Sequence, residues 1–374
     1  MLRIIKLFFL GILFFVAEAK AENFLMNPEV RTFIDKLVEE NGFDRVELSM
    51  LFAKARYQQT ALSFYNTSIK PLPRKCKPTG IKSGTKCRST GSWDIYSHSL
   101  LSMLTVQKGK SYMRRHQKTL KRAYRKYGVP PEYITAIIGI ESYFGKNTGQ
   151  YPAFDTLATL AFEPNRRQDF FRSELKAFLL MTRREKVDPR KVKSSYAGAI
   201  GLGQFMPSNY KSLAVDFDHD GKIRMNDPDD AIGSIAHYFR KSGWKRGLEV
   251  AVPATFPGHK YKDKKTGYQY RYKRSELKKS RPKRPLRYHG PIYLIKLQRA
   301  NYDELWYGTS NFYAITRYNH SDYYAMAVFQ LAQKIMGRRV DQASGLGEGL
   351  LMPGSDLDHF LDSPVKGRKF IIEL

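Results

Sequence analysis

Apolar residues recur at the spacing of one helical face in many segments of this chain, which predicts a mainly helical fold. The segments that we expect to be helices are 27–43, 44–57, 110–128, 130–145, 153–162, 166–187, 227–244 and 321–337. Three short apolar runs, at 291–298, 303–308 and 311–319, predict strands. The small, glycine-rich stretch 194–210 predicts a loop that leads into a helix. The pattern therefore predicts a predominantly α member of the α+β class.

One predicted helix carries a carboxylate on its apolar stripe. Pro130 and Pro131 are suited to its start. Glu141 then follows Ile134 and Ile138 at helical spacing, on the face that these residues would bury. Burial disfavours the charged form of a carboxyl and raises its pKa, which suits a general acid near neutral pH. The alternative is a structural glutamate whose charge is satisfied by a tyrosine, an arginine or a helix N-terminus.

The first residues have the pattern of a secretory signal peptide. Arg3 and Lys6 precede an apolar run at 7–17, and Ala19-Lys20-Ala21 resembles a cleavage site. We therefore expect a signal peptide at 1–21 and a mature protein that is periplasmic or secreted. No later segment predicts a transmembrane helix, and no cysteine near the cut could carry a lipid. Residues 338–374 lack strong periodicity and are predicted to be a C-terminal extension.

The chain has two cysteines, Cys76 and Cys87. In an exported protein, two nearby cysteines favour a disulfide. A metal site is the weaker interpretation, because no histidine or third cysteine lies close by. We expect a surface loop closed by a Cys76–Cys87 disulfide.

The net charge of +29 predicts attraction to polyanions. Nucleic acid, an anionic membrane and cell-wall carboxylates all fit, and export favours the cell wall over nucleic acid. The charge is concentrated in an insert at 256–290, where residues 260–287 hold thirteen Lys or Arg against Asp263 and Glu276, with four interleaved tyrosines. This insert is either a basic, aromatic binding surface or an exposed loop that adds solubility.

The stretch 216–227 has the spacing of a calcium-binding loop. Asp216, Asp218 and Asp220 alternate, Gly221 permits a sharp turn, and Asp227 ends the loop after twelve residues. The backbone carbonyl of Lys222 would add a further oxygen ligand. The alternative is a polar turn in which Asp227 only caps the next helix. We predict a structural Ca²⁺ site with Asp216, Asp218, Asp220, Lys222 and Asp227 as ligands.

An ordered set of motifs resembles the lytic murein transglycosylase B family, glycoside hydrolase family 103. The motifs are IIGIESYFGKNTG, FDTLATLAF, RRQDFFRSELKAFLLM, SSYAGAIGLGQFMPSNY, the loop 216–227, AIGSIAHYF and NFYAITRYNHSDYYAMAV. The resemblance runs from about residue 27 to 336, and residues 130–244 are its most specific part. It implies a lysozyme-like core with extra helices and a small β element, within one peptidoglycan-cleaving domain at 22–337.

The resemblance also implies the reaction and its residues. Glu141 matches the family's single catalytic glutamate, which protonates the β-1,4 bond between N-acetylmuramic acid (MurNAc) and N-acetylglucosamine (GlcNAc). The N-acetyl group assists, and the ionised glutamate then takes the proton of the MurNAc C6 hydroxyl, which leaves a 1,6-anhydro end. The matching cleft residues, expected to bind substrate, are Tyr96, Ser195, Gln204, Tyr238, Asn319 and Tyr324. Ser142 and Phe144 depart from the family's usual threonine and tryptophan.

Two other functions are consistent with these residues. A lysozyme-type hydrolase on the same fold would let water attack in place of the C6 hydroxyl, and its substrate could be deacetylated peptidoglycan. A non-catalytic protein could instead bind the wall or another polyanion through the insert. The partner in each interpretation is peptidoglycan, with no nucleic acid expected, and the protein is predicted to be a monomer.

Overall fold

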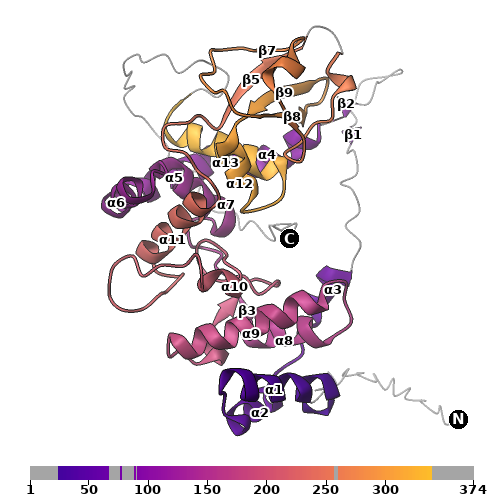
Figure 1. Ribbon diagram of the computed structural model, residues 1–374, viewed down its shortest axis with the longest axis vertical. Coiled ribbons are helices and arrows are strands. Elements are labelled where there is room, and N and C mark those ends of the chain that lie inside the picture. Colours follow the sequence, from indigo (N-terminus) through magenta and orange to yellow (C-terminus); the bar gives the residue numbers. More distant parts are fainter. Residues whose placement is uncertain (1–23, 67–75, 78–87, 90, 257–259, 339–374) are drawn as a thin grey trace, which may run out of the picture. The chain divides into compact units, whose positions relative to one another are not determined.

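A computed structural model describes residues 24–66, 76–77, 88–89, 91–256 and 260–338 of the 374-residue chain (Figure 1). The predicted signal peptide, the Cys76–Cys87 disulfide and the extension beyond residue 338 lie outside the described residues. The chain divides into two compact units, residues 1–59 and 60–374. The sequence analysis treated residues 22–337 as one domain, and those boundaries stay a prediction.

The described part of the chain is mainly helical. In the first unit, Asn27 and Asp44 cap the helices α1 and α2 by accepting backbone N–H groups, as expected of these residue types. The α-helices are α1 (Pro28–Asn41), α2 (Arg45–Ala53), α3 (Gln59–Asn66), α4 (Ser92–Leu100), α5 (Met103–Arg115), α6 (Gln117–Tyr127), α7 (Pro131–Ser142), α8 (Ala153–Phe162), α9 (Gln168–Arg184), α10 (Pro207–Tyr210), α11 (Pro228–Lys241), α12 (Ser310–Thr316) and α13 (Asp322–Ile335).

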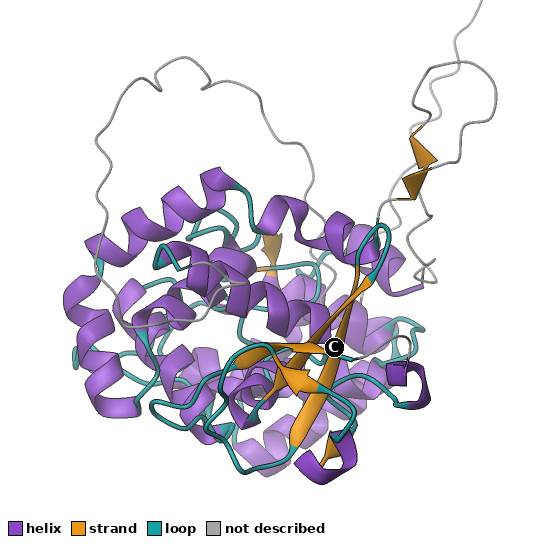
Figure 2. Cartoon of the chain, turned by 90° about the horizontal axis from the view of Figure 1, so that it is seen from above, coloured by secondary structure: helices purple, strands orange, loops and turns teal. Residues whose placement is uncertain are grey.

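The strands form two short pairs and one five-stranded antiparallel sheet. The larger sheet has the order β6-β8-β9-β5-β7, and its central pair aligns Ile295 with Trp306. Figure 2 shows the strands of the larger sheet in orange; β8 contacts α4, and β9 contacts α12. The strands are β1 (Cys76–Lys77), β2 (Arg88–Ser89), β3 (Tyr151–Pro152), β4 (Lys193–Ser194), β5 (Ala251–Thr255), β6 (Arg271–Tyr272), β7 (Arg281–Pro282), β8 (Ile292–Gln298) and β9 (Asp303–Gly308).

Most of the predicted helices are confirmed within a few residues, and two segments differ. The basic segment 110–128 is two helices, α5 and α6, because the backbone at His116 leaves helical geometry with φ −104° and ψ 24°. The strand predicted at 311–319 is wrong, because residues 310–316 form α12. The Thr309 side chain caps this helix by accepting the Asn311 N–H. A short apolar run does not separate a buried helix from a strand.

The basic insert is folded onto the sheet. It supplies both edge strands, β6 and β7. Its Leu277 is buried in a cluster with Val252 and Leu294, and the partly buried Tyr272 and Tyr288 pack against the same cluster. The apolar residues of the insert are therefore part of the core of the sheet.

Helix α7 lies at the centre of the helical core of the second unit. It packs against α5, α6, α11 and α13. Ten of its twelve residues, including Ile134, Ile137 and Ile138, are buried. A side chain at the end of α7 is therefore held by helices from three distant parts of the sequence.

Candidate active site

Glu141 is the penultimate residue of α7. The helix ends at Ser142, three residues before the predicted stop at Gly145, because Tyr143 and Phe144 adopt left-handed backbone geometry with φ of 50° and 59°. The Ser142 hydroxyl donates to the Ile138 carbonyl and accepts the Gly145 N–H, which fixes this turn. The backbone around Glu141 is therefore closely defined.

The Glu141 carboxyl is partly buried and has one tyrosine partner. The Tyr324 hydroxyl donates to Glu141 Oε1 at 2.5 Å. Burial raises the pKa of Glu141 to about 7, and the Tyr324 hydrogen bond acts in the opposite direction. A carboxyl with this pKa can both give and take a proton near neutral pH. The sequence left two interpretations of Glu141, a glutamate paired with a tyrosine and a catalytic acid. The structure is consistent with both, because the carboxyl has a tyrosine partner and a raised pKa.

Tyrosines line the side of Glu141 that α11 and α13 provide. Tyr324 is buried, and its ring stacks on that of Tyr318 with centroids 6.5 Å apart. The Tyr318 ring in turn lies 4.7 Å from that of Tyr238. Tyr318 donates to the Gly203 carbonyl at 2.6 Å, and Tyr238 donates to the Arg317 carbonyl. The structure thus brings together Glu141 with the predicted Tyr238 and Tyr324.

Tyr318 was missed by the sequence analysis. Burial and the charge of Glu141 raise its pKa well above the ordinary value, so this tyrosine is close enough to the carboxyl to feel its charge. The signal that could have found it is its position beside Asn319, within the same RYNHS motif.

Gln204 and Asn319 lie on loops next to these tyrosines. Gln204 has φ 50°, and its amide donates to the carbonyls of Thr148 and Gly201 at 3.1 and 2.8 Å. Asn319 is buried, and its Oδ1 has no hydrogen-bond partner among the described residues. An unpaired buried acceptor is costly, and neighbouring protein atoms cover this oxygen. Gln204 directly follows Gly203, whose carbonyl accepts the Tyr318 hydroxyl. Gln204 therefore lies next to the group of tyrosines.

Ser195 and Tyr96 complete the set of predicted cleft residues. The Ser195 hydroxyl accepts the N–H groups of Ala197 and Ala199 within its own turn, and no hydrogen bond described for it reaches Glu141. Tyr96 on α4 lies 5.6 Å, ring to ring, from Tyr323. Tyr96 is also the last of the groups that raise the pKa of Tyr324, so it lies close to the tyrosine that binds Glu141.

The departure at Phe144 has a packing explanation. A Cβ on Gly139 would lie 2.6 Å from Cζ of Phe144, and one on Gly109 would lie 3.3 Å from the same atom. The ring therefore occupies the space that Gly139 leaves open on α7, whereas Ile335 comes closest to the space at Gly109 on α5. A ring in this position supports the turn that follows Glu141.

An acidic group forms at the predicted calcium loop, and it includes Asp230 of α11, which was not among the predicted ligands. Carboxylate oxygens of Asp216, Asp218 and Asp230 lie within 4.8 Å of one another. Two oxygens that each lie about 2.3–2.6 Å from one Ca²⁺ can be up to about 5 Å apart, so the separation fits this ion. Burial and the charges of Asp218 and Asp227 raise the pKa of Asp230. A cation among these carboxylates would remove that repulsion.

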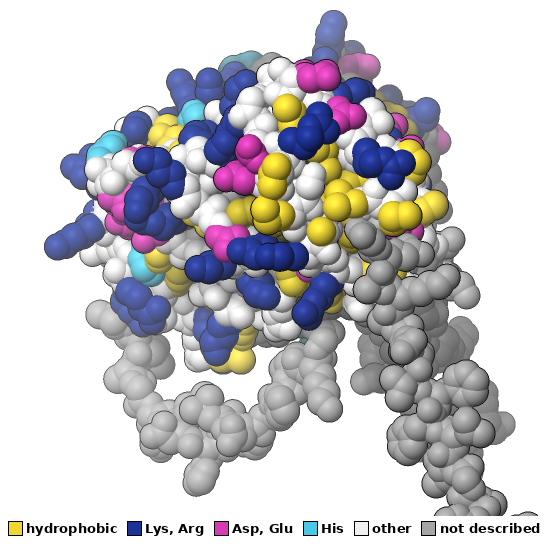
Figure 3. All heavy atoms as spheres, turned by 90° about the horizontal axis from the view of Figure 1, so that it is seen from below, with side chains coloured by type: hydrophobic (Ala, Val, Ile, Leu, Met, Phe, Trp, Pro, Cys, Tyr) yellow, Lys and Arg dark blue, Asp and Glu magenta, His cyan; other side chains and the backbone are white. Residues whose placement is uncertain are grey.

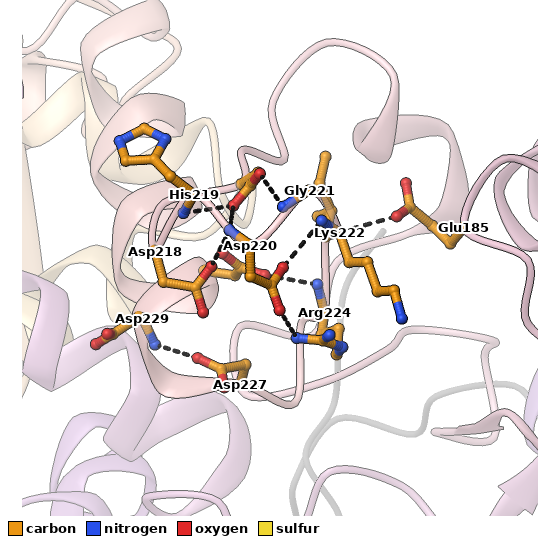
Figure 4. Close-up of polar contacts among 12 residues, drawn as sticks. Glu185, Asp218, His219, Asp220, Gly221, Lys222, Arg224, Asp227 and Asp229 are labelled. Carbon is orange, nitrogen blue, oxygen red and sulfur yellow. Dashed lines mark hydrogen bonds and ion pairs between the residues drawn. The ribbon is translucent and has the colours of Figure 1, made fainter.

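Asp227, the last residue of the loop, is not one of these three residues, and its assignment as a ligand stays a prediction. The Asp227 carboxylate accepts the Asp229 N–H at 2.7 Å and caps α11, which was the alternative considered (Figure 4). Asp230, three residues further along the chain, closes the acidic group. Asp220 pairs with Arg224 at 2.6 Å and accepts the Lys222 N–H, so it lies outside the group of three. The Lys222 carbonyl stays a predicted ligand.

The surface is basic, as the composition predicts. On the face in Figure 3, Lys and Arg side chains are spread among fewer acidic ones. No helix in the described ranges has the length and apolar content to span a membrane.

Comparison with known proteins places these features in a family. Residues 26–333 match the family described as the transglycosylase SLT domain. The chain is 41% identical over 327 residues to membrane-bound lytic murein transglycosylase B of Escherichia coli K12, with 85% of each chain covered.

Solved structures agree with this match. The E. coli lytic transglycosylase SLT35 in complex with calcium is 40% identical with a TM-score of 0.76, and the match covers 84% of this chain and 94% of that one. SltB3 of Pseudomonas aeruginosa, in complex with NAG-anhNAM-pentapeptide, is 25% identical with a TM-score of 0.69, and the match covers 87% and 83%.

Proposed function

The chain belongs to the transglycosylase SLT domain family, and we propose that it cleaves the glycan strands of peptidoglycan with Glu141 as its single acid and base. The predicted family, the lysozyme-like and predominantly helical fold class, and the enzyme class are confirmed. The observation that carries the proposal is the partly buried Glu141 carboxyl, whose pKa of about 7 leaves it protonated in much of the enzyme near neutral pH.

The first half of the reaction is protonation of the leaving oxygen. The target is the β-1,4 linkage between MurNAc and GlcNAc. Glu141, held at 2.5 Å by the Tyr324 hydroxyl, gives its proton to the glycosidic oxygen as the bond to C1 breaks. The same hydrogen bond stabilises the carboxylate that remains, because a donor to the charged form favours it.

The second half uses the same oxygen atoms as a base. The causes of the Glu141 pKa shift are burial and the Tyr324 hydrogen bond, and no second carboxylate is among them. A mechanism with one carboxylate is therefore suitable, in which the N-acetyl group of the substrate stabilises C1. The Glu141 carboxylate then accepts the proton of the MurNAc C6 hydroxyl while that oxygen bonds to C1. The product carries a 1,6-anhydro end, and the enzyme regains its protonated glutamate.

The surrounding polar groups would position the sugar. The Oδ1 of Asn319 has no partner among the described residues, so a hydrogen bond from an amide or hydroxyl of the substrate would satisfy it if the bound sugar reaches this buried atom. The rings of Tyr96 and Tyr238, with those of Tyr318 and Tyr324, offer apolar faces for a pyranose. We therefore propose Tyr96, Ser195, Gln204, Tyr238, Asn319 and Tyr324, with Tyr318 added, as the substrate-binding set.

Digestion of purified sacculi followed by mass spectrometry tests the proposal. The expected products are muropeptides with anhydro ends, which are lighter by one water than hydrolysed ends. Hydrolysed ends in their place would identify a lysozyme-type hydrolase. The variant Glu141→Gln should leave binding to sacculi intact and abolish their clearing. Clearing that persists in this variant would show that Glu141 is not the acid.

We also propose that Asp216, Asp218 and Asp230 hold a structural Ca²⁺ ion. The support is a donor set made of hard carboxylate oxygens at a suitable separation. Asp230 also accepts the N–H groups of Phe217 and Arg224 at 2.7 Å each, so it connects the two ends of the loop to α11. The ion would neutralise the three charges and fix this loop against the helix.

Export to the periplasm or beyond is proposed from the pattern at residues 1–21. The net charge of +29 then has a use, since the stem-peptide carboxylates of peptidoglycan make it anionic. The partner is the glycan strand, and the chain is proposed to act as a monomer without binding nucleic acid.

A further inference from the structure

Tyr324, whose hydroxyl contacts Glu141, lies in the N-terminal turn of α13. Ser321 caps the helix by accepting the Tyr324 N–H at 3.3 Å. The Tyr323 hydroxyl lies 2.7 Å from Ser92 Oγ on α4. Tyr324 itself donates to Glu141. Helix ends fray unless they are held, so the contacts of this turn bear on the position of Tyr324.

Asp322, the remaining residue of this turn, is held by the basic insert. The backbone N–H of Tyr268 donates to Asp322 Oδ1 at 2.8 Å. Gly267 has φ +121°, and a Cβ there would lie 2.9 Å from Asp322 Oδ2. The ring of Tyr268 also stacks on that of His320, with centroids 6.2 Å apart. The turn at 267–268 therefore contacts residues on both sides of the helix cap.

The turn at 267–268 is itself fixed to the sheet. The Gly267 N–H donates to the Leu294 carbonyl of β8 at 2.8 Å. The Gly267 carbonyl accepts the Tyr270 N–H at 3.1 Å, immediately before β6, which pairs with β8. A displacement of the turn away from Asp322 would therefore have to distort the sheet edge.

The hydrogen bond between Tyr268 and Asp322 holds a carboxylate in a partly buried position. Burial raises the pKa of Asp322 to about 6. No ion pair with Asp322 is described within the resolved ranges of the chain, and its partner is the Tyr268 N–H. An acidic residue in the first turn of a helix is favourable by itself, but that role does not require a glycine pressed against the carboxylate.

We propose that the Gly267–Tyr268 turn of the insert, acting through Asp322, positions Tyr324 on Glu141. Gly267 and Asp322 are positioning residues, since neither touches the reacting atoms. The proposal rests on the role of Glu141 as the acid. It gives the insert a place in the active site, in addition to its basic surface.

The test is the pH profile of glycan cleavage by the variant Gly267→Ala. Its added methyl group should push Asp322 away and weaken the Tyr324 hydrogen bond, so the pKa of Glu141 and the alkaline limb of the profile should rise, by up to about one pH unit. Gly243→Ala is the matched control, because Gly243 also has a positive φ (+93°) but no atom within 4 Å of its Cβ position. It should leave the profile unchanged.

A double variant identifies the route of the effect. In a Tyr324→Phe background the hydroxyl is gone, so Gly267→Ala should produce no further shift. If Gly267→Ala does not fold, Asp322→Ala replaces it and should move the alkaline limb of the profile to higher pH in the same way. Asp322→Asn keeps an acceptor for the Tyr268 N–H, so its profile should match that of the wild type.

Three results would overturn the inference. The first is an unchanged alkaline limb in a folded Gly267→Ala variant, and the second is an unchanged limb in Asp322→Ala. The third is a shift that persists in the Tyr324→Phe background. If Glu141→Gln is inactive while any of these results is found, only the positioning role fails. If Glu141→Gln remains active, the proposed function fails first.

Discussion

Replacing Glu141 with Gln should stabilise the protein at alkaline pH and leave its stability nearly unchanged at acidic pH. Glutamine resembles the protonated carboxyl and keeps an acceptor for the Tyr324 hydroxyl. The folded-state pKa of about 7 lies above the ordinary value of 4.5, so the unfolded chain ionises first. As pH rises from about 4.5 to 7, the wild type loses stability that the variant keeps.

The size of the effect follows from the two pKa values. One pKa unit corresponds to about 1.4 kcal/mol, so the difference between the two proteins should grow to about 3 kcal/mol by pH 8. Urea unfolding of both proteins at several pH values from 4 to 8 measures it. Glu39→Gln, which changes an exposed carboxyl on α1, is the control and should show no such trend. A difference between Glu141→Gln and wild type that stays constant over this range would refute the burial argument.

Three further predictions address the neighbours of the acid and the acidic loop. Tyr324→Phe removes the hydrogen bond that lowers the pKa of Glu141, so the alkaline limb of activity should move up by about one pH unit and turnover should fall roughly 10-fold, as pH-dependent kinetics on sacculi would record. We expect added calcium to raise the melting temperature of the wild type, and Asp230→Asn should abolish this rise. Asp227→Ala should lower the free energy of unfolding by about 1 kcal/mol with or without calcium, because it removes a helix cap, and should keep the rise. Equal responses to calcium in the two variants would count against Asp230 as a ligand. Gly139→Ala should destabilise the protein by about 1–3 kcal/mol in thermal or urea unfolding, because its methyl group would meet an aromatic ring at 2.6 Å.

The sequence predicted those parts of the structure that depend on local pattern. Helices α11 and α13 have clear apolar stripes and polar caps, and the ends of both were predicted to within three residues. Glu141 was identified because a carboxylate on an apolar stripe is a conflict that can be seen in the sequence itself. Helix α12 was predicted as a strand, because its short apolar run is buried all round and has no face to reveal a period.

Features that depend on the meeting of distant segments could not be predicted in this way. Asp230 enters the acidic group from within α11, which a twelve-residue loop template does not include. The contact between Tyr268 and Asp322 joins positions 54 residues apart, and neither belongs to a motif that implies the other. Tyr318 has a sequence signal in its position beside Asn319, but its stacking on Tyr324 comes from a tertiary contact that the motif does not show.

The pKa of Glu141 is set by burial and by one hydroxyl group, and this determines how the enzyme should respond to salt. The chain holds 64 Lys and Arg, yet burial and a neutral hydroxyl set the affinity of this carboxyl for its proton. Dissolved ions weaken attraction between exposed charges over roughly 8 Å at physiological strength, but they do not reach a group shielded by packed side chains. A high salt concentration should therefore weaken the binding of the protein to anionic peptidoglycan. The turnover of substrate that is already bound should stay the same.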